Sequence, residues 1–422
     1  MKRYAKYKDS GISWIGDVPE HWTVSSLRKH LRFISDKGHP NEQLLSVTRE
    51  QGVIIRNVES KEENHNFIPD DLSGYKLVVE GQFAINKMKA WQGSYAVSSY
   101  TGIVSPAYYI CELKIDYKPF FNLAIRSRAY IPFFTMYSKG IRVDQWDLSP
   151  IGLKSIPFFV PPPEEQKAIA EFLDSKTKQI NELVFAKQKQ IELLKEYKQA
   201  VIAKAVTQGI NPKAKMKDSG ISWIGQIPEH WDITRIRHVF EESDEKIEDN
   251  SGILLSLSQY TGISLKSDCE KTGMSEAEST EGYKIVHKGQ FVMNIMLAWN
   301  GSYAVSDLEG IISPAYCVFN FITKCNQWYI HYLLRIKAYS GAFKTLSKGI
   351  IDSRLRLYPN KFYTFPVIVP PPEEQSQIVA FIKEKVSAID SQIASVEKQI
   401  ANLNEYKQSL ISDVVTGKVK VA

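Results

Sequence analysis

The sequence predicts an α+β fold in which two α/β domains are joined by two long antiparallel coiled-coil helices, arranged as a pseudo-twofold internal repeat. The first observation is a motif, Pro-Pro-Pro-Glu-Glu-Gln, that occurs at residues 161–166 and returns at 370–375, an offset of 209. The second is a segment, residues 8–22, that returns at 217–231 with the same offset. The third is a long stretch after each motif that contains neither Gly nor Pro. A chain that repeats several segments at one spacing consists of two copies of one unit.

Each long stretch is predicted to be one helix. Proline is tolerated before and at the first helical position, and two glutamates in the first turn suit the positive end of the helix dipole. Gly209 and Gly417 are typical residues at which such helices end. Residues every seven positions form a coiled-coil seam. The seam runs through Leu173, Ile180, Lys187, Leu194 and Val201 in the first copy, and through Ile382, Ile389, Val396, Leu403 and Leu410 in the second.

The two seams can pair within one chain or with a second molecule. Two matching helices in one chain can pair without a partner, so we favour an intramolecular antiparallel pair over a dimerisation zipper. The prediction then divides the chain into four parts. They are an α/β domain at 1–160, a long helix at 161–208, a second α/β domain at 209–369, and a second long helix with a C-terminal tail at 370–422.

Composition indicates an ordinary globular chain, with 43% hydrophobic and 24% charged residues. The net charge of +6 is compatible with a nucleic-acid partner without being diagnostic of one. Residues 1–8 lack the apolar core of a signal peptide, and no apolar run approaches membrane-spanning length, so we expect a cytoplasmic protein. The four cysteines lack CxxC spacing, which predicts reduced thiols and no metal site.

The repeated segment at 8–22 and 217–231 predicts an irregular start to each domain, because Gly, Ser and Pro punctuate it. His21 and His230 each lie beside a tryptophan with no second histidine or acid at ligand spacing, so we interpret them as packing residues rather than as ligands or bases. The expected apolar anchors are Trp14, Trp22, Trp223 and Trp231.

The two halves then differ, at residues 36–75 and 244–283, although both contain short strand-like runs. Two frames that agree while their loops differ are typical of two readers of different targets. Agreement resumes at 81–98 and 289–306, where alternating residues predict strands that continue into 105–108 and 313–316. Short helices are expected near 119–130 and 327–340. Apolar edge strands at 157–160 and 366–369 lead into the long helices.

A basic loop, Ser-Lys-Gly-Ile, occurs at residues 138–141 and at 347–350. Glycine beside cations and hydroxyls suits a loop that binds phosphates, and a solvated surface turn fits almost as well. The candidate nucleic-acid contacts are Lys139, Arg142, Lys348 and Arg354, with Lys87, Lys89, Arg49 and Gln259 as further candidates for groove contacts.

Catalytic motifs are missing. The sequence contains neither a GxxxxGK[ST] loop nor a GxGxxG motif opening a βαβ unit, and Asn211-Pro212-Lys213 lacks the aromatic residue of an amino-methylating motif. We therefore expect a protein without catalytic residues, metal or cofactor of its own.

The twin Lys-Asp-Ser-Gly-Ile-Ser-Trp-Ile-Gly segments, the twin helix starts and the paired Glu-Tyr-Lys-Gln at 196–199 and 405–408 carry a family resemblance. Over nearly its whole length the chain resembles the specificity subunit of type I restriction-modification systems. The resemblance implies two target recognition domains, each reading one half of a split, asymmetric site in double-stranded DNA. It implies helices that set the spacing and dock modification subunits, which carry S-adenosylmethionine, and a separate restriction subunit that can join them.

Two other classes share part of the pattern. A coiled-coil scaffold or adaptor with two peptide-binding domains would have the repeat and the helices, but would not need Lys, Arg, Asn and Gln on matching loops. A nuclease with two catalytic lobes would need metal-binding carboxylates recurring in both halves, and the sequence offers no convincing set. The DNA reader is the interpretation that accounts for most of the repeated residues.

Overall fold

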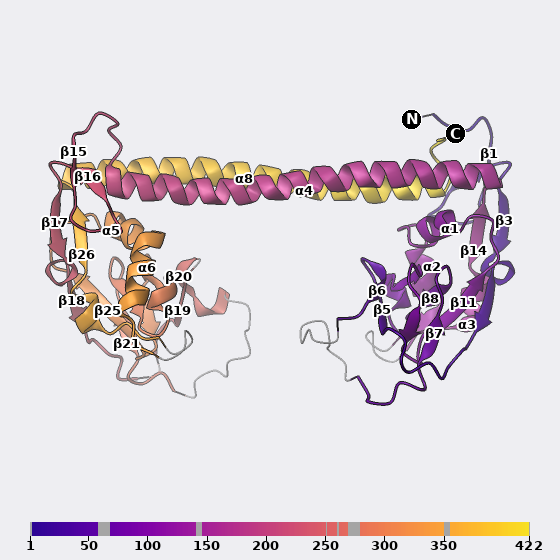
Figure 1. The fold of residues 1–422 in the computed structure, drawn as a ribbon, viewed down its shortest axis with the longest axis horizontal. Helices are drawn as coiled ribbons and strands as arrows, with labels where there is room; N and C mark the ends of the chain where they lie inside the picture. The colour runs from indigo at the N-terminus through magenta and orange to yellow at the C-terminus, as the bar shows by residue number, and fades with distance from the viewer. Residues whose placement is uncertain are drawn as a thin grey trace. The chain divides into compact units, whose positions relative to one another are not determined.

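The structure is a computed structural model that describes residues 2–57, 68–140, 146–249, 251–259, 261–268, 279–349 and 355–421. The chain divides into two compact units. The first contains Met1–Gln188 and Glu397–Ala422, and the second contains Lys189–Val396. Each unit therefore combines one α/β domain with part of each of two long helices (Figure 1).

The long helices are α4, Pro163–Gln208, and α8, Pro372–Val415. In the first unit Lys187 Nζ donates to Gln399 Oε1 at 2.5 Å, and Lys407 Nζ donates to Asn181 Oδ1 at 2.9 Å. A later residue of α4 thus meets an earlier residue of α8, which makes the pair antiparallel. Lys187, the polar position of the predicted seam, is accommodated by an amide.

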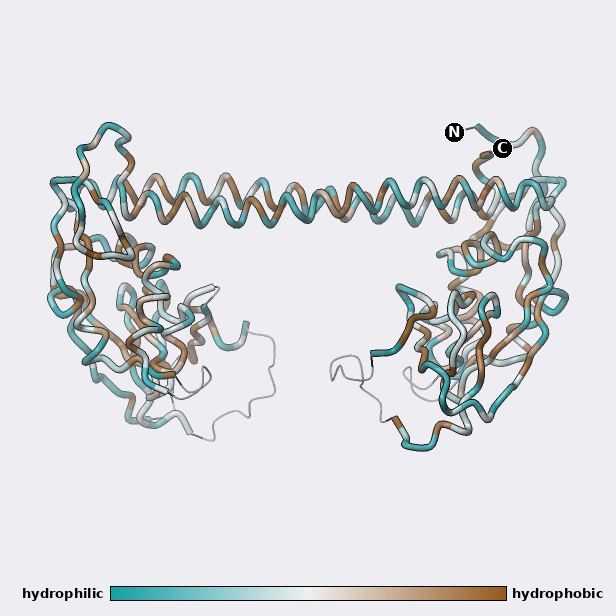
Figure 2. Tube along the Cα trace, in the orientation of Figure 1, coloured by the Kyte–Doolittle hydropathy of each residue, from teal (hydrophilic) through white to brown (hydrophobic). Residues whose placement is uncertain are grey.

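The seam residues of both helices are buried or half-buried. Figure 2 shows hydrophilic and hydrophobic residues alternating along the two helices, as an amphipathic helix requires. In the first unit Leu173, Ile180 and Leu410 join the core beneath the helices. In the second unit Ile382 of the seam does the same, whereas the predicted seam residue Val201 is half-buried and its neighbour Ile202 joins the core instead. The heptad pattern therefore predicted most of the residues that are buried along the two helices.

The first unit contains fourteen of the described strands, and the central sheet has four strands in the order β4-β11-β8-β9, all antiparallel. The strands are β1 Tyr7–Asp9, β2 Asp17–Pro19, β3 Thr23–Ser26, β4 Leu31–Ile34, β5 Leu45–Thr48, β6 Gly52–Ile55, β7 Lys76–Val78, β8 Phe83–Ile85, β9 Tyr95–Val97, β10 Gly102–Val104, β11 Tyr109–Leu113, β12 Ser138–Lys139, β13 Asp147–Leu148 and β14 Pro157–Val160. The helices are α1 Lys118–Ile125, α2 Ile131–Met136 and α3 Pro150–Ser155, with 3-10 turns η1 Leu27–Lys29 and η2 Ala90–Gln92.

The second unit repeats this arrangement around a sheet in the order β18-β25-β22-β23. Its described strands are β15 Met216–Asp218, β16 Gln226–Pro228, β17 Asp232–Arg235, β18 Phe240–Ser243, β19 Leu255–Ser258, β20 Gly262–Leu265, β21 Lys284–Val286, β22 Phe291–Asn294, β23 Tyr303–Val305, β24 Gly310–Ile312, β25 Tyr316–Phe321 and β26 Pro366–Val369. The helices are α5 Gln327–Leu334, α6 Lys337–Leu346 and α7 Pro359–Phe362, with 3-10 turns η4 Ile236–His238, η5 Lys266–Asp268 and η6 Ala298–Asn300.

Both faces of the central sheet are buried, because alternate residues of a strand point to opposite faces. On β8, Phe83 and Ile85 join the main core with the helices. Ala84, between them, packs instead with Val47 and Val53 of the hairpin β5–β6. The second unit divides its core in the same way. The hairpin, which lies in the region where the two halves differ, is thus attached directly to the repeated sheet.

One predicted strand extension is wrong in both halves. Residues 105–108 form a turn between β10 and β11, closed by the Tyr108 N–H donating to the Ser105 carbonyl at 3.0 Å. Residues 313–315 repeat it before β25 begins at Tyr316, whose N–H donates to the Ser313 carbonyl at 3.0 Å. Pro106 has no N–H to donate to a ladder, which favours a turn over a strand here.

The irregular start of each unit is fastened to its long helix. Trp22 is fully buried, and its indole nitrogen donates to Glu165 Oε2 at 3.3 Å, while His21 Nε2 lies 2.9 Å from the same oxygen. At the end of α8, Gly417 has φ +76°, and a Cβ there would lie 2.2 Å from the Pro19 side chain. The motif glutamate thus binds side chains as well as the helix dipole, and His21 is a hydrogen-bonded packing residue.

The observed elements confirm the predicted fold class. Two α/β domains, built on the same strand order, are joined by two long helices that pair antiparallel. Short strands β14 and β26 pair with β3 and β17 directly before each long helix, as the edge-strand prediction expects. The repeated segments of the sequence are therefore repeated elements of structure.

Candidate nucleic-acid interface

A two-stranded ribbon, β12 and β13, carries the first candidate lysine. Lys139 pairs with Asp147 across the ribbon, and the Leu148 N–H donates to the Lys87 carbonyl oxygen at 3.0 Å. The Lys87 ammonium lies 2.7 Å from Asp147 Oδ2, and this hydrogen bond raises the pKa of Lys87. Ser138 and Lys139 therefore form a strand, where the sequence predicts a phosphate-binding loop. The ribbon brings Lys87 and Lys139 next to the same aspartate.

The turn that carries Lys89 is built around a buried asparagine. Asn86 Oδ1 accepts from the Met88 N–H at 3.2 Å, and its Nδ2 donates to the Tyr108 hydroxyl at 3.0 Å. The Asn86 carbonyl accepts from the Lys89 N–H at 3.0 Å. A buried amide with satisfied hydrogen bonds holds a turn in one conformation. Met88 and Lys89 are exposed beside η2 as a result.

Arg49 lies in the turn between β5 and β6, which Arg126 supports from beneath. Arg126 Nη2 donates to the carbonyl oxygens of Arg49 and Glu50, at 3.0 Å each, and Nη1 donates to that of Tyr95 at 2.7 Å. Burial lowers the pKa of Arg126 through desolvation. Gly52 has φ +78°, and a Cβ there would lie 3.1 Å from the guanidinium. The backbone of the turn is therefore held by hydrogen bonds from this arginine.

The second unit has the same support under Gln259. Arg335 Nη2 donates to the Gln259 carbonyl oxygen at 2.6 Å, and its Nη1 donates to that of Tyr303 at 2.5 Å. Desolvation lowers the pKa of Arg335 as well. The hairpin β19–β20 corresponds to β5–β6, so Gln259 occupies the position of Arg49. The same hairpin and supporting arginine thus carry an arginine on the turn in one unit and a glutamine in the other.

The ribbon also recurs in the second unit, with different charges. Lys348 and Arg356 exchange backbone hydrogen bonds of 3.0 and 2.9 Å, and the Leu357 N–H donates to the Ile295 carbonyl oxygen at 2.9 Å. Ile295 stands where the first unit has Lys87, and Arg356 stands where it has Asp147. Lys348 and Arg356 are both exposed. The second ribbon is therefore more basic than the first, because its carboxylate is replaced by a guanidinium.

The structure brings four of the eight candidate residues together around η2 in the first unit. Lys87 and Lys139 flank Asp147, Lys89 precedes η2, and a Cβ on Gly93, directly after η2, would lie 3.9 Å from Arg49 Cγ. In the second unit Lys348 and Gln259 lie on the corresponding ribbon and turn. Arg142 and Arg354 lie outside the described residues.

Several cations of the interface were not among the candidates from sequence. Arg126 and Arg335 recur at the 209-residue offset, a signal that a systematic comparison of the halves would detect. Lys344, in α6, lies with its Nζ 5.1 Å from the Trp299 ring centre. Arg356 has no counterpart of like charge, so the repeat gives no signal for it.

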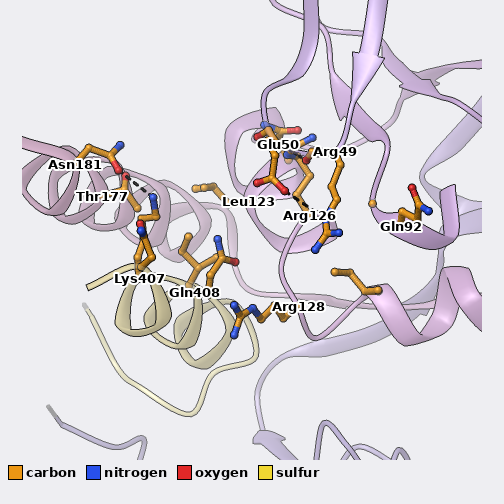
Figure 3. Close-up of a pocket in the computed structure, with 15 residues that line it drawn as sticks. Arg49, Glu50, Gln92, Leu123, Arg126, Arg128, Thr177, Asn181, Lys407 and Gln408 are labelled. Carbon is orange, nitrogen blue, oxygen red and sulfur yellow. Dashed lines mark hydrogen bonds and ion pairs between the residues drawn. The ribbon is translucent and has the colours of Figure 1, made fainter. Parts of the chain in front are cut away.

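A cavity of about 580 Å³ adjoins the Arg49 turn (Figure 3). Residues of the α/β domain, of α4 and of α8 line it, all within the first unit. Four of the lining residues are cations, namely Arg49, Arg126, Arg128 and Lys407, and one, Glu50, is an acid. Its walls are therefore suited to an anion.

Two other kinds of site find no support in the part of the chain that the structure describes. No group of three or more His, Cys, Asp or Glu side chains there can hold a metal ion. Burial raises the pKa of the Cys111 and Cys317 thiols to about 12, so neither is a reactive thiolate at neutral pH. No described helix is long and apolar enough to cross a membrane.

Comparisons with known proteins match the chain along almost its full length. No family model matches the sequence. The type I restriction enzyme MjaVIII specificity subunit of Methanocaldococcus jannaschii is 24% identical over 440 residues, which cover 96% of this chain and 94% of the relative. A second protein of that organism, described as the MjaX specificity subunit of a type I restriction enzyme, is 21% identical over 434 residues, covering 96% of both chains.

Solved structures share the fold. A chain from work on complex assembly and conformational transition of the type I R-M system superposes with a TM-score of 0.64 at 13% identity, covering 95% of this chain and 99% of that one. The HsdS subunit from Thermoanaerobacter tengcongensis superposes with a TM-score of 0.50 at 14% identity, covering 95% and 98%. The repeated segments predict a resemblance to the specificity subunits of type I restriction-modification systems. The comparisons confirm this resemblance over 95–96% of the chain.

Proposed function

We propose that this chain is the DNA-binding specificity subunit of a type I restriction-modification complex, in which each α/β domain reads one half of a split, asymmetric site. One observation carries the proposal beyond the family resemblance. The same turn, supported by the same arginine, and the same ribbon occur in both units, while the side chains that they present differ. Two readers with one frame and different contact residues suit a site whose halves have different sequences.

The candidate residues suit two kinds of contact with DNA. Lysines such as Lys139 and Lys348, on the ribbons, suit phosphate contacts, which position a protein on the duplex without reading sequence. Arg49 and Gln259, on the hairpin turns, suit base edges in the major groove, where arginine pairs with guanine and glutamine with adenine. The hairpins lie in the region that differs between the halves, as residues that read sequence must.

The long helices serve as a spacer in this proposal. A helix of 46 residues at about 1.5 Å per residue is long enough to separate two major-groove segments by more than one helical turn of DNA. Modification subunits that bind S-adenosylmethionine would dock on these helices, and a restriction subunit would join them. The chain itself would supply binding and spacing and no catalytic group, and would act in the cytoplasm on double-stranded DNA.

The proposal is tested by reconstitution. The chain is purified alone and together with its modification subunits, and transfer of labelled methyl groups from S-adenosylmethionine to DNA is measured. We expect methylation only when both proteins are present, at one split sequence. Methyl transfer by the lone chain, or methylation by the modification subunits at the same sequence without the chain, contradicts the proposal.

The alternative, a scaffold with two peptide-binding domains, shares the helices and the repeat. The exposed cations Lys89, Lys139 and Lys348 favour the DNA reader, because peptide binding does not require them. Retention on heparin with a steep dependence on salt supports a DNA reader. Retention that does not change with salt supports the scaffold.

A further inference from the structure

We infer that the cavity beside the Arg49 turn in the first unit is a binding site for a phosphate group of the DNA backbone, held by Arg128 and Lys407. The inference rests on the proposed function and adds a contact between the Arg49 turn and the paired helices. Figure 3 shows the lining side chains arranged around this space.

Of the four cations that line the cavity, two already have strong partners and two do not. The Arg49 side chain lies 3.3 Å from the Glu50 carboxylate, and the Arg126 guanidinium donates to three backbone carbonyls. Arg128 is exposed and has no ion-pair partner among the described residues. Lys407 binds only the neutral amide oxygen of Asn181, at 2.9 Å. Two cations therefore face the cavity without a carboxylate to neutralise them.

In the second unit the lysine that corresponds to Lys407 is paired with a carboxylate. Lys198 corresponds to Lys407 at the repeat offset, and Asp390 corresponds to Asn181. Lys198 Nζ lies 2.8 Å from both carboxylate oxygens of Asp390. The first unit has an amide in place of that carboxylate, so no carboxylate balances the positive charge of Lys407 and the ammonium can bind an anionic ligand. The repeat thus marks the first unit as the one with the anion site.

The lining residues favour a phosphodiester over a free nucleotide. None of them is aromatic, and the apolar ones are Leu123, Ile131 and Ile411. A nucleotide base needs an apolar or aromatic surface to stack upon, whereas a backbone phosphate needs only cations and amide donors. Polar amides supply the rest of the wall, from Gln92, Asn122, Asn181, Asn404 and Gln408.

The cavity is continuous with the candidate interface. Arg49, Gln92 and Gly93 line it and also belong to the turn and to the segment around η2. A duplex bound at those elements would bring its backbone to the mouth of the cavity. Since Arg128 belongs to the α/β domain and Lys407 to α8, one phosphate between them would also tie the domain to the helices.

The test uses the full chain in complex with its modification subunits. Binding to a duplex with the recognised site, and to an unrelated duplex, is measured over a series of salt concentrations for Arg128→Ala, Lys407→Ala and Asn181→Asp. The last variant copies the Lys198–Asp390 pair, so the second unit shows that the fold accepts it. Lys398→Ala, an exposed lysine on the same helix outside the cavity, is the control.

We expect each of the three variants to weaken binding roughly threefold to tenfold on both duplexes and to lower the salt slope by about one, with the methylated sequence unchanged. Lys398→Ala should match the wild type. Wild-type affinity and slope in all three variants overturn the inference.

Two further results identify a different ligand. If ATP, added without DNA, raises the melting temperature of the wild type but not of Lys407→Ala, while DNA binding by that variant is unchanged, the cavity holds a free nucleotide and the inference is wrong. If the variants lose the modification subunits during purification, it is a protein contact and the inference is also wrong. Failure of the proposed function looks different, because the wild-type complex then shows no sequence preference on DNA.

Discussion

Glu165, in the first turn of α4, accepts a hydrogen bond from the indole nitrogen of the buried Trp22 across 143 residues of chain, at 3.3 Å. Glu374 and Trp231 repeat the bond at 3.1 Å in the second unit. Each unit therefore fastens its irregular start to its long helix through one carboxylate. The motif glutamates that the sequence marks as helix-dipole partners also hold this junction.

The first prediction is that Glu165→Ala lowers the free energy of unfolding by about 1–3 kcal/mol, because the buried Trp22 indole loses its acceptor and Tyr4 and His21 lose their hydrogen bonds to the same carboxylate. The measurement is the midpoint of urea unfolding. Glu164→Ala is the control, since that exposed neighbour interacts mainly with the helix dipole, an effect below about 1 kcal/mol. Equal destabilisation by the two substitutions would show that the hydrogen bonds to the Glu165 carboxylate contribute nothing.

The second prediction concerns acid sensitivity in the second unit. His331 Nδ1 accepts from the Val305 N–H at 3.1 Å, and desolvation lowers the pKa of His331 from 6.5 to about 3. Between these values the unfolded chain binds a proton that the folded chain does not. Stability should therefore fall as the pH drops below 6.5, by about 1.4 kcal/mol per pH unit from this group.

His331→Asn should remove that contribution and keep the hydrogen bond. In the first unit Asn122 Oδ1 accepts from the Val97 N–H at 2.9 Å in the corresponding place. The free energy of unfolding is measured at pH 7 and pH 5 for both proteins. We expect the wild type to lose roughly 2 kcal/mol more than the variant between these values. An equal loss in both would mean that His331 is protonated in the folded protein.

The third prediction addresses the arginine beneath each hairpin turn. Arg126→Ala removes the donor for three backbone carbonyls, so it should destabilise the chain by roughly 2–4 kcal/mol. Arg126→Lys should recover only part of this, because one ammonium cannot reproduce the planar fork. Arg49→Ala, on the exposed side of the turn, should leave the unfolding midpoint unchanged. Similar midpoints for Arg126→Ala and Arg49→Ala would contradict the supporting role.

The fourth prediction separates phosphate contacts from base contacts. Lys139→Ala and Lys348→Ala should each weaken binding to every duplex and lower the salt slope by about one. Gln259→Ala should instead cost roughly 1–3 kcal/mol of discrimination at one base pair of one half-site. The measurement is a salt titration on single-base variants of the recognised sequence. An unchanged salt slope in a protein with alanine at Lys139, Arg142, Lys348 and Arg354 would remove these four cations from the interface.

The fifth prediction treats the paired helices as a ruler. Seven residues inserted near Gln188, with seven more near Glu397 in the partner helix, lengthen the pair by roughly 10 Å and keep the seam in phase. That length corresponds to about three base pairs, which also rotate the second groove by about a third of a turn. The methylated site should acquire a longer spacer with both half-sites unchanged, or methylation should stop. Methylation of the original spacer at the original rate would refute the ruler.

The sequence predicted the parts of the fold that repeat. The seam of α4 and α8 and the edge strands before them were predicted from a heptad period and from segments next to the repeated motif. The hairpins β5–β6 and β19–β20 were predicted from short strand-like runs, although they lie in the regions where the two halves differ. The strand predicted at residues 105–108 is wrong. The prediction gave more weight to the alternating pattern of residues than to Pro106, which cannot donate to a ladder.

The interface was less predictable because its key contacts are made to the backbone. Arg126 binds carbonyl oxygens 31 and 77 residues away, and any residue can supply a carbonyl oxygen, so no sequence pattern marks the partner. The pairing of Lys87 with Asp147 depends in the same way on the ribbon, which brings β13 beside the segment that follows β8. Candidate cations could be named from their loops, but their neighbours required the fold.

The central claim is that this chain selects the sequence that its modification subunits methylate. The most direct measurement is base-resolution mapping of methylated adenines in cells that express the modification subunits with and without this chain. The account predicts methylation at one split, asymmetric sequence only when the chain is present, and at one altered half-site when residues 209–369 are exchanged for those of a relative. Methylation that is the same with and without the chain would contradict it.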